Sequence, residues 1–208
     1  MRIERAFFER DTLTVARELI GQVIAAESPD GTARGVIVET EAYLGTRDDA
    51  AHTYKGRTAR TAPLFGPKGC AYVYLIYGMY CCLNISAGLK DEPDCVLIRA
   101  LRPAGGLEIM KERRRTDKET ALCSGPGKLC MAMGIGREDS GEDLCSGTGR
   151  IYLEYGGPPE KVEATPRIGI DYAEKCRGEL WRFMEEGSPW VSRGTRHRSQ
   201  KIETIMRL

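Results

Sequence analysis

Two segments of the chain contain the residues best suited to chemistry. VIVETEAYLG, residues 36–45, places the carboxylate of Glu41 at the end of a β-like run and two residues before the ring of Tyr43. AYVYLIYGMYCCLNIS, residues 71–86, carries four tyrosines around a tight bend, with Asn84 beyond it. Aromatic faces, a carboxylate and an amide are the groups needed to hold a planar base and to perform acid–base chemistry beside it. This combination points to the excision of nucleic-acid bases.

Each of these residues also has a structural interpretation. Glu41 could be an exposed carboxylate at a strand end, the tyrosines could pack across neighbouring strands, and Asn84 could be a structural amide with satisfied hydrogen bonds. A bulky residue at the bend, Tyr77, favours a functional role over a structural one. Proteins that take a base out of a duplex fill the gap with an inserted side chain, and Tyr77 is the candidate for that wedge.

The elements that must position these residues are mostly strands. In the first segment, strict alternation would put Ile37, Glu39 and Glu41 on one face. In the second, Gly78 and Met79 are expected to form a two-residue hairpin loop. The expected strands are 22–26, 36–40, 71–77, 80–86, 95–101, 151–154, 167–170 and 180–183, and the expected helices are 13–20, 106–115 and 126–133.

This pattern predicts an α+β fold: a single domain built on a mostly antiparallel, curved β-sheet, with a protruding β-hairpin and surrounding short helices. The domain is expected to span residues 1–208, and residues 193–208 read as a basic, flexible tail. The polar segment 44–69 lacks any sustained period, and irregular segments of that length are usually functional.

The composition excludes several classes of protein. Hydrophobic residues make up 41% of the chain and the net charge is only +1, so neither a disordered protein nor a uniformly basic one is expected. No apolar stretch approaches the roughly 18 residues of a membrane helix, and MRIERAFFER has no continuous apolar core typical of a signal peptide. An intracellular protein without membrane association is expected. Eight cysteines without a C-x-x-C pair, and only two histidines, favour free thiols over a metal site.

Taken together, these segments resemble the alkyladenine DNA glycosylase family, also called methylpurine or 3-methyladenine DNA glycosylases. The matching blocks follow one another along most of the chain: VETEAYLG at 38–45, DDAAH at 48–52, YVYLIYGMYCCLNIS at 72–86, CVLIRAL at 95–101, LCSGPGKLC at 122–130 and GSPWVS at 187–192.

The resemblance implies a monofunctional DNA glycosylase. Such an enzyme flips alkylated or deaminated purines, of the 3-methyladenine, 7-methylguanine, hypoxanthine and ethenoadenine class, out of duplex DNA. It hydrolyses the N-glycosidic bond, leaves an abasic site and so initiates base excision repair. The resemblance also implies a monomer that uses no cofactor and no metal and acts on double-stranded DNA with damaged purines. Such an enzyme works in the cytoplasm or nucleoid of a prokaryote or in the nucleus of a eukaryote.

The resemblance also implies roles for particular residues. Glu41 falls on the general base that activates water, and Arg99 on an arginine that orders this water. The walls of the base pocket are then formed by Tyr43, His52, Tyr74 and Asn84, of which Asn84 discriminates against the 2-amino group of guanine.

The remaining matches concern contacts with DNA. Tyr77 falls on the intercalating residue of the hairpin, whereas Arg57, Lys128 and Ser188 fall on positions that contact the DNA backbone. The stretch 53–71 departs from the family pattern, so the phosphate contacts and the range of lesions are the least specific parts of the match.

Two other functions fit the same residues. A non-catalytic protein could use the aromatic pocket to bind lesions or RNA, although a binder has no need of Glu41. An interaction domain could use the hairpin aromatics as its core, in which case Tyr77 would be needed for folding.

Overall fold

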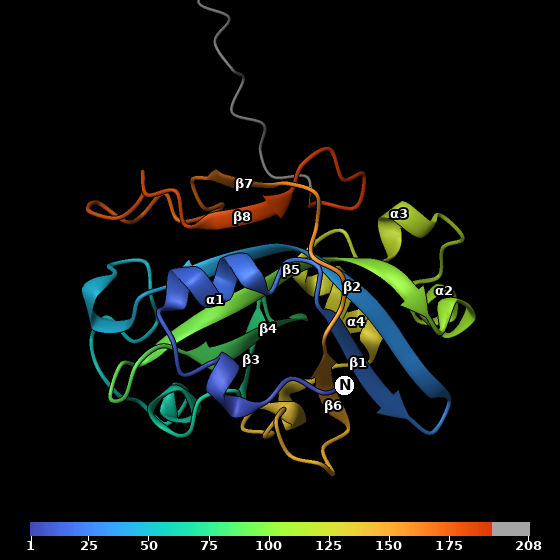
Figure 1. The fold of residues 1–208 in the computed structure, drawn as a ribbon, viewed down its shortest axis with the longest axis horizontal. Helices are drawn as coiled ribbons and strands as arrows, with labels where there is room; N and C mark the ends of the chain where they lie inside the picture. Colours follow the sequence, from blue (N-terminus) through green and yellow to red (C-terminus); the bar gives the residue numbers. More distant parts are fainter. Residues whose placement is uncertain (193–208) are drawn as a thin grey trace, which may run out of the picture.

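The chain folds around one antiparallel sheet that curls across the molecule (Figure 1). The structure, a computed structural model, describes residues 1–192. In this part of the chain the strand order is β3-β4-β5-β2-β1-β6, with β8 beside β2 and β7 beside β8. The strands are β1 (Val23–Ser28), β2 (Gly31–Tyr43), β3 (Ala71–Ile76), β4 (Tyr80–Ala87), β5 (Asp94–Gly105), β6 (Ile151–Glu154), β7 (Val162–Thr165) and β8 (Arg182–Glu185).

Strand β2 is the centre of this arrangement. Along one side it pairs with β5, from Arg34 to Tyr43. Along the other side its first half pairs with β1, ending at Val36 opposite Val23, and its second half pairs with β8, where Glu41 lies opposite Arg182. Because β2 pairs with β1 over its first half and with β8 over its second half, it joins the N-terminal strand β1 and the C-terminal strand β8 to one sheet.

Short helices cover the sheet. They are α1 (Thr12–Glu18), α2 (Leu107–Arg114), α3 (Glu119–Leu122) and α4 (Pro126–Met133), with 3₁₀ turns at Arg5–Phe7, Gly45–Arg47, Ala62–Phe65 and Arg137–Asp139. Asp11 caps α1 by accepting a hydrogen bond from the Thr14 backbone N–H at 2.9 Å. Helix α4 has the predicted bounds, with proline in its first turn and Gly134 ending it at φ 67°, as these residues favour.

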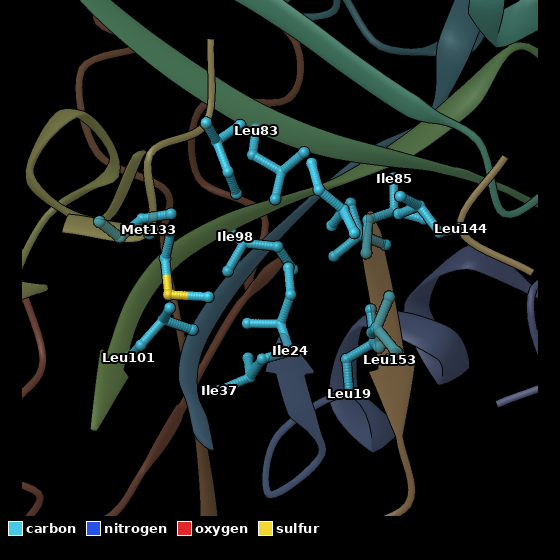
Figure 2. Packing of buried hydrophobic residues seen from close by; sticks show 14 of the residues in the cluster. Leu19, Ile24, Ile37, Leu83, Ile85, Ile98, Leu101, Met133, Leu144 and Leu153 are labelled. Carbon is cyan, nitrogen blue, oxygen red and sulfur yellow. The ribbon is translucent and has the colours of Figure 1, made fainter. Parts of the chain in front are cut away.

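The core lies between the sheet and these helices. Figure 2 shows Ile24, Ile37 and Ile98 from the central strands converging with Leu19, at the end of α1, and with Met133 of α4. All five side chains are almost completely removed from solvent. This burial supplies the main stabilisation of the domain, and it fixes one face of the sheet to the interior.

The hairpin β3–β4 differs from the prediction at its tip. Ile76 pairs with Tyr80, so the loop contains Tyr77, Gly78 and Met79 and is one residue longer than expected. The Met79 N–H donates to the Ile76 carbonyl at 3.3 Å, while Tyr77 and Gly78 have φ values of 53° and 70°. Two successive positive φ values are typical of a type I′ turn, whose twist matches that of the flanking strands.

The fold class is confirmed, but the C-terminal strands are not where the sequence suggested. The predicted strand 167–170 is wrong: these residues form no strand, and the Ile168 backbone N–H donates to the side chain of Glu41 and not to a neighbouring strand. Strand β7 was missed, and β8 begins two residues later than expected. The predicted tail, 193–208, lies outside the described residues, so the one-domain span 1–208 stays a prediction. No helix among residues 1–192 is both long and apolar enough to span a membrane.

Two substitutions in the hairpin test which of its residues stabilise the fold. Leu83 is fully buried in the core, whereas Tyr77 is 83% exposed at the tip. We expect Leu83→Ala to lower the free energy of unfolding by about 2–5 kcal/mol, and Tyr77→Ala to change it by less than about 0.5 kcal/mol. Urea unfolding of both variants measures the difference. A large loss of stability in Tyr77→Ala would support the interaction-domain alternative.

Candidate active site

A row of paired residues across four strands builds the floor of the site. Tyr72 on β3 pairs with Asn84 on β4, Asn84 with Leu97 on β5, and Leu97 with Glu41 on β2. Directly opposite residues in antiparallel strands point to the same face. Four residues far apart in the sequence are thereby aligned on the face of the sheet opposite the core.

A break in the regular pairing of β2 and β5 turns Glu41 toward this face. The register shifts on both sides of Glu39, and Ile37 and Ala42, five residues apart, belong to the same core cluster. The prediction that Ile37, Glu39 and Glu41 share a face is therefore wrong for Ile37. Bulges of this kind redirect side chains and often lie beside active sites.

The carboxylate of Glu41 is fully buried and held from three directions. Its Oε2 accepts hydrogen bonds from the Tyr43 hydroxyl at 2.9 Å and from Arg99 Nη1 at 3.2 Å. Its Oε1 accepts from the Ile168 backbone N–H at 2.7 Å. A buried carboxylate is tolerated only with such donors, and its orientation is consequently fixed.

Arg99 joins Glu41 to a second buried carboxylate. Its Nε donates to Glu39 Oε1 at 3.0 Å, and the same oxygen accepts from Arg182 Nε at 2.6 Å. Ser192 completes this network, since its backbone N–H donates to Glu39 Oε2 at 2.6 Å. Two carboxylates and two guanidinium groups compensate one another's charge, which is required where no water is available to solvate them.

A cavity of about 590 Å³ opens above this floor. The four residues predicted to form the walls of a base pocket line it: Tyr43, His52, Tyr74 and Asn84. Tyr77, the predicted intercalating residue, and Arg99, predicted to order the water, line it as well. Glu41 does not line the cavity; it lies one hydrogen bond behind Tyr43 and Arg99, which do. Tyrosines and aliphatic residues make up most of its lining, together with a few polar groups such as His52, Asn84 and Arg99, a composition typical of small-molecule and base pockets.

His52 stands at the edge of this cavity. Its Nδ1 lies 2.9 Å from the Tyr72 hydroxyl, and its ring meets the Tyr74 ring edge-on with 4.6 Å between centroids. Partial burial against Tyr72 and Tyr74, followed by the positive charge of Arg60, lowers the pKa of His52 to about 4. The imidazole is therefore neutral at physiological pH, where it can donate one hydrogen bond and accept another.

The tyrosines of the pocket also stay uncharged. Burial raises the pKa of Tyr72 to about 12 and raises that of Tyr74 further. Burial and the adjacent charge of Glu41 raise the pKa of Tyr43 well above its ordinary value. The hydroxyl of Tyr43 therefore remains a donor to Glu41, and the rings of Tyr72 and Tyr74, 5.5 Å apart, remain neutral stacking surfaces.

Asn84 is a buried amide that lines the cavity. Its Nδ2 donates to the Tyr72 carbonyl at 3.1 Å, and the Cys95 thiol lies 3.8 Å from its Oδ1. Burial raises the pKa of the Cys95 thiol far above neutrality, so the thiol remains a donor. All eight cysteines of the chain carry free thiols.

The three residues expected to contact a DNA backbone do not line the cavity. Arg57 is exposed, with its guanidinium 5.9 Å from the Phe65 ring. Lys128 is exposed on the first turn of α4, directly after Pro126 and Gly127, which do line the cavity. Ser188 is half-buried.

Several residues of the site were not identified from the sequence. Arg60, Tyr172 and the loop 168–170 line the cavity, and Glu39 and Arg167 form buried ion pairs beneath it. Arg60 belongs to the segment 44–69, whose irregular composition was a usable signal. Nothing in the sequence around Arg167 distinguishes it from a residue in an ordinary strand.

Asp48, Asp49 and Cys176 approach one another closely enough to suggest a metal site. However, Asp48 is already paired with Arg167. Asp49 accepts hydrogen bonds from three successive backbone N–H groups, those of residues 174–176. The oxygens are thus occupied by protein donors, and the cluster is explained as a structural turn.

The pKa of His52 can be measured by NMR titration, because the chain has only two histidines. We expect one imidazole to titrate near pH 4 and Arg60→Ala to raise that value. An unfolded histidine has a pKa of about 6.5, so the unfolded state binds more protons between pH 6.5 and 4. His52 should therefore make the protein less stable as the pH falls through this range. Titration of both histidines near pH 6.5 would contradict the assigned environment.

Comparison with known proteins identifies the family of the chain. The family model described as methylpurine-DNA glycosylase (MPG) matches residues 6–189. Three relatives carry the name "Putative 3-methyladenine DNA glycosylase". The protein of Methanocella arvoryzae is 47% identical over 92% of this chain and 96% of its own length. Those of Clostridium tetani and Bacillus cereus (strain Q1) are 42% and 48% identical over 93% of this chain and their full length.

The match covers both the segments that form the sheet and those that form the cavity, from residue 6 to residue 189. The chain belongs to the methylpurine-DNA glycosylase family, whose members hydrolyse the N-glycosidic bond of DNA.

Proposed function

We propose that this glycosylase flips alkylated or deaminated purines out of duplex DNA and hydrolyses them from the sugar with water activated by Glu41. The purines are those of the 3-methyladenine, 7-methylguanine, hypoxanthine and ethenoadenine class. The observation that carries the proposal is the buried Glu41 carboxylate, held by Tyr43, Arg99 and the Ile168 amide behind an aromatic cavity. A glycosylase needs a fixed carboxylate beside a base pocket, whereas a protein that only binds does not.

In the proposed reaction Glu41 removes a proton from a water molecule that enters the cavity wall between Tyr43, Arg99 and Ile168, the three lining residues that hold this carboxylate. Its Oε1 accepts one bond, from Ile168 N–H, and so has an acceptor position left for water. Water attacks the anomeric carbon, the bond from this carbon to the purine nitrogen breaks, and its electron pair leaves with the base. The negative charge of Glu41 also stabilises an oxocarbenium-like transition state.

Arg99 has two roles in this proposal. It pairs with Glu41 and Glu39, and these ion pairs compensate the charge of the two carboxylates in the interior. It also lines the cavity, so its guanidinium can orient the attacking water. Among residues 1–192 no lysine lines the cavity, which supports attack by water and a reaction that leaves the DNA strand intact.

The aromatic walls favour a damaged purine in two ways. Alkylation at N3 or N7 makes the base cationic and a better leaving group, and it adds cation–π attraction to Tyr43 and Tyr74. A neutral lesion such as hypoxanthine has no such charge, so it depends on hydrogen bonds, for which neutral His52 is available, and on protonation of the departing base. The pocket therefore suits both classes, with different groups contributing to each.

The exposed hairpin tip supports the base-flipping part of the proposal. Tyr77 and Met79 are 83% and 67% exposed, and Tyr77 also borders the cavity. A ring in this position can fill the gap that a flipped nucleotide leaves in the stack. Arg57, Lys128 and Ser188 are proposed to contact the DNA backbone. We infer a monomer that acts inside the cell, where its DNA substrate lies.

The catalytic role of Glu41 is tested by base release from duplex oligonucleotides carrying one hypoxanthine or ethenoadenine, alongside methylated DNA. We expect Glu41→Gln to lower the release rate by about 10²- to 10⁴-fold, the usual contribution of a general base, while binding to lesion-bearing duplex persists. Retained melting temperature in the variant controls for folding. If the native protein bound such duplexes preferentially but released no base, the binding-protein alternative would be correct.

The role of Asn84 is tested by selectivity among purines. One Nδ2 hydrogen is committed to the Tyr72 carbonyl, and the other would meet the 2-amino group of guanine donor to donor. Leaving a buried donor unpaired costs about 1–3 kcal/mol, which corresponds to roughly 5- to 150-fold in rate.

We therefore expect Asn84→Ser to raise the rate of release of unmodified guanine, relative to that of hypoxanthine, by roughly 5- to 150-fold. Cys82→Ala is a matched control because Cys82 lies on the same strand and also lines the cavity. Equal selectivity in the native protein and in Asn84→Ser would show that Asn84 does not contribute to the selectivity of the pocket.

A further inference from the structure

Arg167 is a fully buried arginine directly beneath the cavity. Its Nη1 and Nη2 donate to the two carboxylate oxygens of Asp48 at 2.5 and 2.9 Å, and Nη1 also donates to the Ala42 carbonyl at 3.0 Å. Its guanidinium lies 4.6 Å from the centroid of the Tyr43 ring and 4.9 Å from that of Trp181. The side chain is thus held in its plane by a bidentate ion pair and between two aromatic rings.

The contacts of Arg167 converge on the groups that hold Glu41. Tyr43, which Arg167 supports on the side away from the cavity, donates its hydroxyl proton to Glu41 Oε2. Ile168, the next residue in the chain, donates its backbone N–H to Glu41 Oε1. Two of the three donors to the carboxylate therefore depend on where Arg167 lies, and the third is Arg99.

The partner of Arg167 extends this support to the segment that bears His52. Asp48 accepts hydrogen bonds from the backbone N–H groups of Leu44 and Ala50, which fixes the turn between Tyr43 and His52. A single ion pair therefore connects the end of β2, the segment bearing His52 and the loop 168–170. These three parts of the chain form one side of the pocket.

We propose that Arg167 is a positioning residue for the glycosylase reaction: through Asp48, the Tyr43 ring and the Ile168 amide, it sets the orientation of the Glu41 carboxylate. This inference rests on the proposed catalytic role of Glu41. Arg167 does not line the cavity and does not touch the substrate. Its effect is on the rate of bond cleavage, since misplacing a reacting group by about 1 Å can cost roughly 100-fold in rate.

The geometry requires arginine at this position. Only a planar guanidinium can form two parallel hydrogen bonds to Asp48 while it stacks between Tyr43 and Trp181. Lysine would keep the positive charge opposite Asp48 but lose the second bond and the stacking. Arg167→Lys therefore tests geometry with the charge conserved.

The experiment compares native protein and Arg167→Lys in single-turnover base release from a hypoxanthine duplex, with duplex affinity measured separately. We expect the cleavage rate to fall by about 10- to 100-fold while the dissociation constant changes less than about threefold. We also expect the acidic limb of the pH–rate profile to move to higher pH, because a carboxylate that accepts fewer hydrogen bonds binds a proton more readily. A purely structural role would lower the melting temperature without moving this limb.

Arg150→Lys is the matched control. Arg150 also forms a two-point pair with a buried aspartate, Asp139, but its other hydrogen bonds go to the carbonyls of Glu27 and Gly134 and not to the groups that hold Glu41. Its variant should lose stability and keep both the cleavage rate and the pH profile of the native protein. If Arg167→Lys does not fold, the double variant Asp48→Asn/Arg167→Gln makes the same comparison without an unpaired buried charge.

The outcomes separate this inference from the proposed function. Native protein that releases no base contradicts the function itself. Native protein that releases base, together with an Arg167 variant that keeps the native rate and pH profile, overturns the positioning role alone. Rate loss and a shifted pH limb in the Arg167 variant, absent from Arg150→Lys, support it.

Discussion

The buried contact of Arg99 with Glu39 and Glu41 is the constraint on which the site depends. An ionised carboxylate without a partner in the interior would cost several kcal/mol, so Glu41 can be kept charged only where cations and N–H donors surround it. Arg99 on β5 and Arg182 on β8 supply the cations on either side of β2. The unusual pairing of β2, with β5 along one side and β8 beside its second half, is what brings these groups together.

The two faces of the sheet consequently have different roles: one stabilises the fold and the other forms the site. One face packs Ile24, Ile37 and Ile98 into an apolar core (Figure 2), whose burial provides stability. The other carries the row from Tyr72 to Glu41 and the aromatic cavity. The register shift around Glu39 allows one strand to serve both, because it reverses the alternation of side chains between Ile37 and Glu41.

Much of the architecture could be predicted from local patterns. Helix α4 and strand β6 have the predicted bounds, and the hairpin was found because apolar and aromatic runs flank a glycine-containing bend. The C-terminal strands were harder. Arg167 and Ile168 look like strand residues, yet their hydrogen bonds go to Asp48 and Glu41, more than a hundred positions away, and such contacts override local propensity.

The sequence by itself determined the kinds of groups available: one carboxylate beside an aromatic ring, a tyrosine-rich hairpin, and the motifs that resemble methylpurine-DNA glycosylases. Only the tertiary structure decided which of these groups meet. It placed Glu41 behind the cavity wall and not in it, and it made Glu39 and Arg167 part of the site. The physical reason is that desolvated charges must find partners, and those partners come from whichever strands and loops the folded sheet brings within hydrogen-bonding distance.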